Sequence, residues 1–170
     1  MIETILNKHA TNQISYYVKD LEAFARKHSA LFGSGPFYYI EPMTQAMNYR
    51  GEEIELTWQP AFGQFGDLQI ELIQVFSEPN PFDELGQHGF HHFSNWVDDF
   101  DAALKHFADA GYEPLFTFQS GGGLQVAYID LSEEFGHFLE IHTPQEGMWN
   151  MIKGTAEDWD GTDPWRSLGG

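Results

Sequence analysis

The chain carries one pattern twice, 79 residues apart, and this repeat constrains its fold more than any other feature of the sequence. Residues 13–18 alternate β-branched and aromatic side chains as a strand does, and Asp20 stands where the N-cap of a helix is expected. Residues 92–97 and Asp99 repeat this arrangement at the same spacing. The sequence therefore predicts two halves with one common architecture.

In each half an amphipathic helix and three more strands follow the first strand. Apolar residues recur every three or four positions in residues 21–32 and 100–108, which predicts two helices. Turn signals then separate six strand candidates. These are residues 37–41, 53–58, 67–75, 115–119, 124–130 and 137–142. We predict an α+β fold of two tandem βαβββ modules around a shared cleft, because one helix covers only one face of a sheet.

The modules define three expected regions of the chain. Residues 11–78 form the first module, residues 89–144 the second, and residues 145–170 a tail rich in Trp and Asp. Trp149, Trp159 and Trp165 favour docking of the tail on the domain or on a partner subunit, with the cleft as one candidate place. A disordered tail is the alternative.

Composition excludes several classes of function. The chain has no cysteine, so thiolate metal sites and Cys nucleophiles are excluded and any metal must be held by oxygen and imidazole nitrogen. Its net charge of -18 repels nucleic acid and anionic membrane surfaces, and we expect neither as a partner. No signal-like start and no span-length apolar run occur. We expect a cytoplasmic protein.

Four side chains that can bind a metal occupy equivalent places in the two halves. Gln13 and His92 open the first strand of each module, and Glu71 and Glu140 lie among alternating apolar neighbours in the last strands. Two carboxylates placed in this way are costly unless they are protonated, hydrogen-bonded or bound to a cation. The four side chains form a set suited to Zn, Ni, Co or Mn, and less to Fe, with positions left for water or substrate.

The period of two along a strand assigns further residues to the faces of the sheet. Tyr17, Trp96 and Phe138 share their faces with the metal-binding residues, and we predict that they contact the substrate. His91 should point to the opposite face, towards the helix or behind the site. Salt bridges from the two glutamates to Arg50 or Lys153 are the alternative to a metal.

The repeated βαβββ pattern and the motifs HHFSNWV, GDLQIELIQV and FGHFLEI resemble the vicinal oxygen chelate superfamily. This superfamily includes glyoxalase I, methylmalonyl-CoA epimerase, extradiol dioxygenases and bleomycin-resistance proteins, and the resemblance covers residues 12–144. It implies that Gln13, Glu71, His92 and Glu140 are the metal ligands, as in eukaryotic-type glyoxalase I, and it favours a homodimer.

The resemblance also implies a reaction. A metal with open positions binds a carbonyl oxygen and a neighbouring oxygen, and so stabilises the enolate-like charge that forms when a proton leaves. By analogy with glyoxalase I, Glu140 is the base and Glu71 assists it. Basic residues for an anionic carrier are few, whereas aromatic residues are plentiful. We therefore predict a glyoxalase I-like lyase or isomerase acting on a small, apolar or aromatic carbonyl compound.

Three other functions remain open. A methylmalonyl-CoA epimerase-like enzyme would use the same chemistry on a CoA ester. An extradiol-type dioxygenase normally needs two His and one carboxylate, and Gln13 takes the place of one His. A non-catalytic binding or resistance protein of the same fold usually lacks the ligand glutamates.

Overall fold

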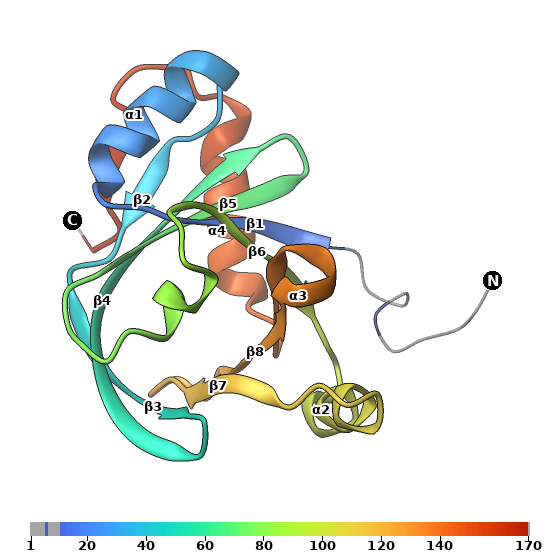
Figure 1. The fold of residues 1–170 in the computed structure, drawn as a ribbon. Coiled ribbons are helices and arrows are strands. Elements are labelled where there is room, and N and C mark those ends of the chain that lie inside the picture. Colours follow the sequence, from blue (N-terminus) through green and yellow to red (C-terminus); the bar gives the residue numbers. More distant parts are fainter. Residues whose placement is uncertain (1–5, 7–10, 170) are drawn as a thin grey trace.

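One strongly curved sheet organises the molecule, in a computed structural model that describes residue 6 and residues 11–169 (Figure 1). The first half contributes β1 (Thr11–Tyr17), α1 (Leu21–Phe32), β2 (Phe37–Tyr39), β3 (Met43–Tyr49), β4 (Glu52–Phe65) and β5 (Leu68–Val75). The 3₁₀ helix η1 (Pro81–Leu85) connects the halves. The second half contributes β6 (Gly89–Trp96), α2 (Phe100–Asp109), β7 (Pro114–Gln119), β8 (Gln125–Leu131), α3 (Ser132–Phe135) and β9 (His137–His142). The tail forms α4 (Glu146–Glu157) and β10 (Trp165–Ser167).

Eight of these strands close into a ring. Within the first half the order is β1, β5, β4, β3, and within the second it is β6, β9, β8, β7. The halves meet twice, through the antiparallel pairs β1 with β6 and β3 with β7. Both halves therefore have the same strand order, and the prediction of an α+β fold with two βαβββ modules is confirmed.

The second strand of the first module was placed wrongly from the sequence. The strand that pairs with β7 is Met43–Tyr49, whereas the predicted residues 37–41 form the short β2 at the far end of β4. Met, Gln and Asn make this segment weak in strand formers. Its alternation of half-buried and exposed residues appears only once it is paired.

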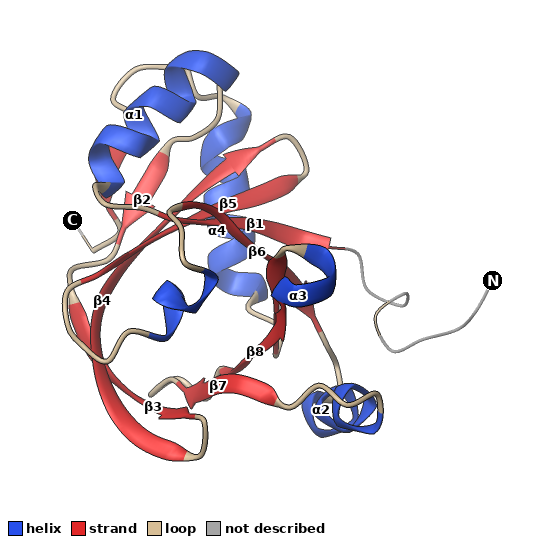
Figure 2. Cartoon of the chain, in the orientation of Figure 1, coloured by secondary structure: helices blue, strands red, loops and turns tan. Residues whose placement is uncertain are grey.

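The two long helices of the modules begin in the same way. Asp20 Oδ1 accepts a hydrogen bond from Ala23 N at 3.0 Å, and Asp99 Oδ1 accepts one from Ala102 N at 2.9 Å, so both predicted N-caps are present. The helices lie on opposite sides of the strands (Figure 2). Each covers the outer face of its own module through a separate apolar cluster, and a third cluster fills the space inside the ring.

The tail packs on the first module. Helix α4 lies against β4 and buries Ile152, and β10 pairs in parallel with β2. Trp165 stacks on Tyr39 with ring centroids 4.8 Å apart. No helix among the described residues has the length and apolar character needed to cross a bilayer.

The close contact of Gly63 with Phe37 gives a test of this packing. A Cβ at Gly63 would lie 2.7 Å from the ring of the fully buried Phe37, so we expect Gly63→Ala to lower the free energy of unfolding by about 1–3 kcal/mol. Gly154→Ala is the control, because that position in α4 is open and alanine should stabilise the helix by about 0.5–1 kcal/mol. Urea denaturation measures both, and equal effects would contradict the packing.

Candidate metal centre

Three charged side chains from different strands converge inside the ring. Glu71 of β5, His92 of β6 and Glu140 of β9 are all buried, and their ligand atoms lie within 4.8 Å of one another. His92 Nε2 lies 2.9 Å from Glu140 Oε2 and 3.3 Å from Glu71 Oε2. We refer to these three residues as the Glu–His–Glu cluster. Each module supplies one of its glutamates.

Gln13 lies at the edge of this cluster on β1. Ser15 Oγ donates to Glu71 Oε2 at 2.7 Å and lies 3.5 Å from Gln13 Oε1, so the amide oxygen is on the side of the cluster. Gln13 Nε2 donates to Gln69 Oε1 at 2.7 Å, and this bond fixes the orientation of the amide. The structure therefore brings the four sequence-predicted ligands to one place, where Gln13 and Glu71 share Ser15 as a neighbour.

Two matching β-bulges lie next to Gln13 and His92, the predicted ligands on the first strand of each module. In the pairing of β1 with β6, Gln13 lies opposite Ser94 and Ser15 lies opposite His92, while Asn12 and His91 have no partner in the register. Asn12 and His91 are themselves 79 positions apart, so each module carries a bulge one residue before its predicted ligand. Bulges commonly redirect a side chain next to a functional site.

The bulge also explains the position of His91, for which the sequence left two places open. His91 does not face a helix, so that alternative was wrong, and it lies instead behind the site. It packs inside the ring against Phe82 and Phe138, with centroid distances of 5.3 and 4.8 Å. Its Nδ1 lies 2.9 Å from His92 Nδ1, and its Nε2 lies 3.2 Å from the carbonyl oxygen of Phe82. His91 therefore supports His92 from behind, and burial together with the charge on His92 lowers its pKa well below the ordinary value.

The three residues of the Glu–His–Glu cluster shift one another's pKa values, and His92 contacts both glutamates. Burial opposes a charged imidazole, but the hydrogen bonds to Glu140 and Glu71 outweigh it and raise the pKa of His92 to about 9. Burial raises the pKa of Glu71. Burial acts in the same direction on Glu140, but the hydrogen bond from His92 and the nearby charge of His142 lower its pKa overall. At neutral pH one imidazolium therefore compensates two buried carboxyl groups.

The cluster fits a divalent ion. Neighbouring ligands at about 2.0–2.2 Å from one ion lie roughly 3 Å apart, which is close to the separations of His92 Nε2 from the two carboxylates. An ion in place of the shared proton would supply the positive charge that two carboxyl groups need. The alternative salt bridges do not form, because Arg50 pairs with Glu84 at 3.1 Å and Lys153 lies 3.5 Å from Asp67.

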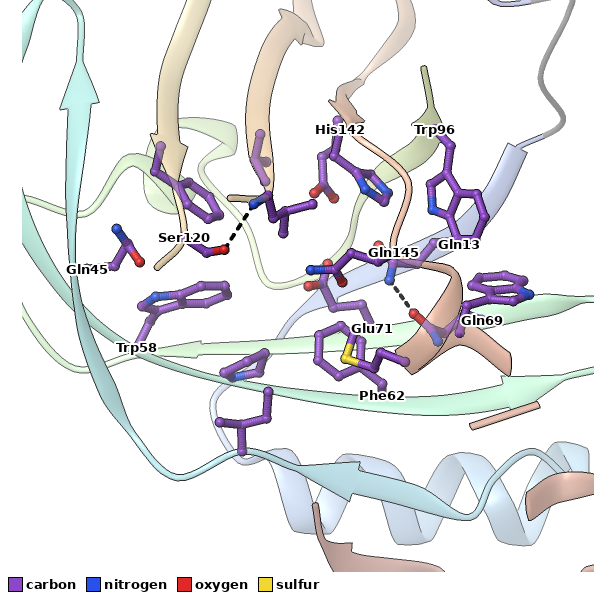
Figure 3. Close-up of a pocket in the computed structure, with 18 of the residues that line it drawn as sticks. Gln13, Gln45, Trp58, Phe62, Gln69, Glu71, Trp96, Ser120, His142 and Gln145 are labelled. Carbon is purple, nitrogen blue, oxygen red and sulfur yellow. Dashed lines mark hydrogen bonds between the residues drawn. The ribbon is translucent and has the colours of Figure 1, made fainter. Parts of the chain in front are cut away.

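A cavity of about 160 Å³ opens on the cluster (Figure 3). Its walls, as far as described residues form them, are mostly apolar and aromatic, with several amides and no Lys or Arg. The lining residues are Gln13, Ile40, Met43, Gln45, Trp58, Pro60, Phe62, Gln69, Glu71, Trp96, Phe118, Ser120, Leu124, Val126, Tyr128, Glu140, His142, Gln145, Met148 and Trp149. A void of roughly 150 Å³ accommodates a benzene-sized molecule.

The three sequence-predicted substrate contacts lie in different places. Trp96 lines the cavity, near Trp149 of α4 at a centroid distance of 5.4 Å. Tyr17 and Phe138 belong to the buried cluster inside the ring and do not line the cavity. Tyr17 Oη instead accepts a hydrogen bond from Asn80 Nδ2 at 2.8 Å. Their contact with a substrate stays a prediction.

Sequence reasoning did not single out Tyr128. Its ring lies edge-on to His92 at a centroid distance of 4.9 Å, and it lines the cavity. Burial and the charges of Glu140 and Glu71 raise its pKa well above the ordinary value, so it stays a neutral phenol. Alternation along the strand that ends near Asp130 could have placed Tyr128 and Val126 on one face, but nothing in the sequence linked that face to His92.

Metal binding should depend on pH through His92. Because its pKa is raised to about 9 in the metal-free protein, an ion must displace its proton at any lower pH. We expect the affinity for Ni²⁺ to rise as pH increases from about 6 and to level off above about 9, with close to one proton released at pH 7. Calorimetry in buffers of different ionisation enthalpy measures both. Binding without proton release would contradict this.

The bond from Gln13 to Gln69 should support metal affinity indirectly. Gln69→Leu removes the acceptor that orients the Gln13 amide, and loss of such a supporting bond typically weakens metal binding about 10-fold or more. Gln74→Leu on the same strand is the matched control and should bind metal as the unchanged protein does. Competition titration against a chromogenic chelator measures the difference, and equal affinities would remove Gln13 from the ligand set.

Comparison with known proteins identifies a family and several structures of similar fold. The model of the Glyoxalase/Bleomycin resistance protein/Dioxygenase superfamily matches residues 12–128. No curated protein sequence matches the chain. Similar solved structures include methylmalonyl-CoA epimerase from Mycobacterium tuberculosis, with a TM-score of 0.58 at 15% identity over 85% of this chain and 93% of that one.

Two further structures show the same fold. A hypothetical protein from Bacillus halodurans C-125 gives a TM-score of 0.56 at 17% identity, covering 81% of this chain and 95% of that one. A methylmalonyl-CoA epimerase in complex with methylmalonyl-CoA and NH4+ gives 0.53 at 17% identity, covering 79% and 94%. At these identities the likeness concerns the fold. The family match spans most of the chain, which belongs to the Glyoxalase/Bleomycin resistance protein/Dioxygenase superfamily.

Proposed function

We propose that the protein is a metal-dependent lyase or isomerase that moves a proton on a carbon next to a carbonyl group, as glyoxalase I-like enzymes do. The observation that carries this proposal is the placement of two buried glutamates at one imidazole nitrogen, with both glutamates in the wall of a mostly apolar cavity. Gln13, Glu71, His92 and Glu140 would hold the ion, with Zn, Ni, Co and Mn as the candidates.

A bound divalent ion would supply positive charge to a substrate oxygen and so favour the enolate form. The protein's own groups handle the proton. Both Glu140 and Glu71 line the cavity, and they come from different modules. We assign removal of the proton to Glu140 and assistance to Glu71, as the likeness to glyoxalase I implies. The aromatic walls and α4 limit the access of water.

The lining of the cavity favours a small carbonyl compound with an apolar or aromatic body. Among the residues that the structure describes, no Lys or Arg lines it, so a phosphate-bearing carrier such as CoA would find no cationic partner from that part of the chain. The fold likeness to epimerases supports a second candidate, a methylmalonyl-CoA epimerase-like reaction, in which one carboxylate removes a proton and the other returns it. The two candidates share their chemistry and differ in substrate.

Replacement of Glu140 tests the proton transfer. We expect Glu140→Gln to lower the rate of deuterium incorporation into an α-hydroxy-ketone by about 10²-fold or more, since general base catalysis contributes that much. The amide still offers an oxygen ligand, so the variant should retain metal. Proton NMR in D₂O measures exchange, and elemental analysis measures metal. Glu133→Gln, at an exposed position on α3, is the control.

The same samples separate the other functions. An active Glu140→Gln variant with bound metal would contradict the base assignment. Exchange on methylmalonyl-CoA alone would favour the epimerase, and oxygen uptake with a catechol by the anaerobically Fe²⁺-loaded protein would favour a dioxygenase. Protein that retains none of the four metals would favour a binding protein.

We also keep the proposal of a homodimer with small-molecule substrates. Support comes from the family and from the exposed apolar side chains of Leu31 and Phe32 at the end of α1. The ring of Phe32 lies 6.1 Å from that of Phe65, which is also exposed. Analytical ultracentrifugation of the full chain decides the oligomeric state.

A further inference from the structure

Trp58 presents a buried hydrogen-bond donor that the protein leaves without a partner. The residue is 6% exposed, and its indole Nε1 is shielded from solvent but makes no hydrogen bond. Buried tryptophan N–H groups usually find an acceptor. Even the half-buried Trp159 donates from Nε1 to the carbonyl oxygen of Thr162 at 2.6 Å. A buried donor without a partner lowers stability, so its retention calls for an explanation.

The donor belongs to the cavity. Trp58 lines it, and its ring is held edge-on to Phe118 at a centroid distance of 6.0 Å and stacked at 6.2 Å with Phe82. Figure 3 shows the indole nitrogen on the side of the ring that faces Gln45 and Ser120. Glu71 lies on the other side of the ring.

The nearby polar groups are already oriented. Gln45 Nε2 donates to the carbonyl oxygens of Ala46 and Gln119, at 3.0 and 3.2 Å, so the Gln45 amide is held by its nitrogen. Ser120 Oγ accepts from Leu124 N at 3.2 Å. These bonds hold a polar end in an otherwise apolar wall, away from the Glu–His–Glu cluster.

Charge narrows what can occupy this end. No Lys or Arg of the described residues 6 and 11–169 lines the cavity, the cluster at the other end is acidic, and the chain has a net charge of -18. An anionic group beside Trp58 would therefore be buried with neutral donors only, at a high desolvation cost. A neutral acceptor, such as a ring nitrogen, an ether or a carbonyl oxygen, meets the indole N–H without that cost.

We propose that the Trp58 indole N–H is a specificity-determining donor for an uncharged substrate that carries a hydrogen-bond acceptor at the end remote from its reacting carbonyl. This rests on the proposed function, because it assumes that the carbonyl end faces the Glu–His–Glu cluster. The substrate class is a neutral α-oxygenated carbonyl compound with a small aromatic or apolar body and one distal acceptor.

Isosteric ligands test this proposal. The probes are 2-hydroxy-1-phenylethanone and its pyridin-3-yl and pyridin-4-yl analogues, used at about pH 8 with metal-loaded protein. A ring nitrogen in place of a CH adds an acceptor without adding volume. We expect at least one pyridyl probe to bind roughly tenfold more tightly than the phenyl probe and to shift the Trp58 indole proton downfield in a ¹⁵N-correlated spectrum.

Variants assign the effect to one nitrogen. Trp58→Phe keeps an aromatic ring and removes the donor, so the preference for the pyridyl probe should disappear while affinity for the phenyl probe changes little. Trp149→Phe, in the same cavity, is the matched control and should retain the preference. Equal binding of all probes to the unchanged protein, absence of binding, or a preference that survives Trp58→Phe would overturn the proposal. Selective binding without deuterium exchange would instead overturn the proposed reaction and leave the donor site standing.

Discussion

The antiparallel pairing of β1 with β6 is the contact on which the candidate site depends. One module alone supplies Gln13 and Glu71, and the other supplies His92 and Glu140. Neither pair could surround an ion. The pairing brings Ser15 opposite His92, so that Glu71, reached through Ser15, meets the imidazole that also contacts Glu140. The second junction, β3 with β7, closes the ring. The first junction therefore joins the modules and at the same time assembles the site.

The Glu–His–Glu cluster concentrates ionisable groups in the interior. Two carboxyl groups and one imidazole are buried together, and the raised pKa values of His92 and Glu71 both reduce the net negative charge there. Hydrogen bonds from neighbouring residues reduce the free-energy cost of burying these groups. Ser15 bonds to Glu71, His91 to His92, and Gln69 to Gln13. Removal of any one of these supports leaves a buried polar group with fewer partners, which is why the supporting residues should matter nearly as much as the ligands.

The sequence predicted the fold well because the repeat and the periodicity are local. The offset between Asp20 and Asp99 located both helices, and strand alternation placed the four candidate ligands on converging strands. Prediction from the sequence failed where strand pairing, rather than local composition, decides the structure. The segment Met43–Tyr49 becomes a strand because β4 and β7 flank it, and the direction of His91 follows from a bulge that alternation cannot reveal. Trp58 and Tyr128 were missed because their roles depend on neighbours distant in sequence.

The matching bulges at Asn12 and His91 have a consequence for how a ligand lies in the cavity. They show that the backbone of the ring keeps the two-fold relation of the repeat down to its irregularities. The side chains do not keep it: Gln13 in one half corresponds to His92 in the other, and Gln69 corresponds to Phe138. A symmetric ring by itself would accept a molecule in either of two opposed directions. The wall of the first module is rich in amides, whereas the wall of the second carries an imidazole and aromatic rings, so the two directions are unequal. The duplicated backbone thus encloses the ligand, and the differences between its side chains select one binding direction.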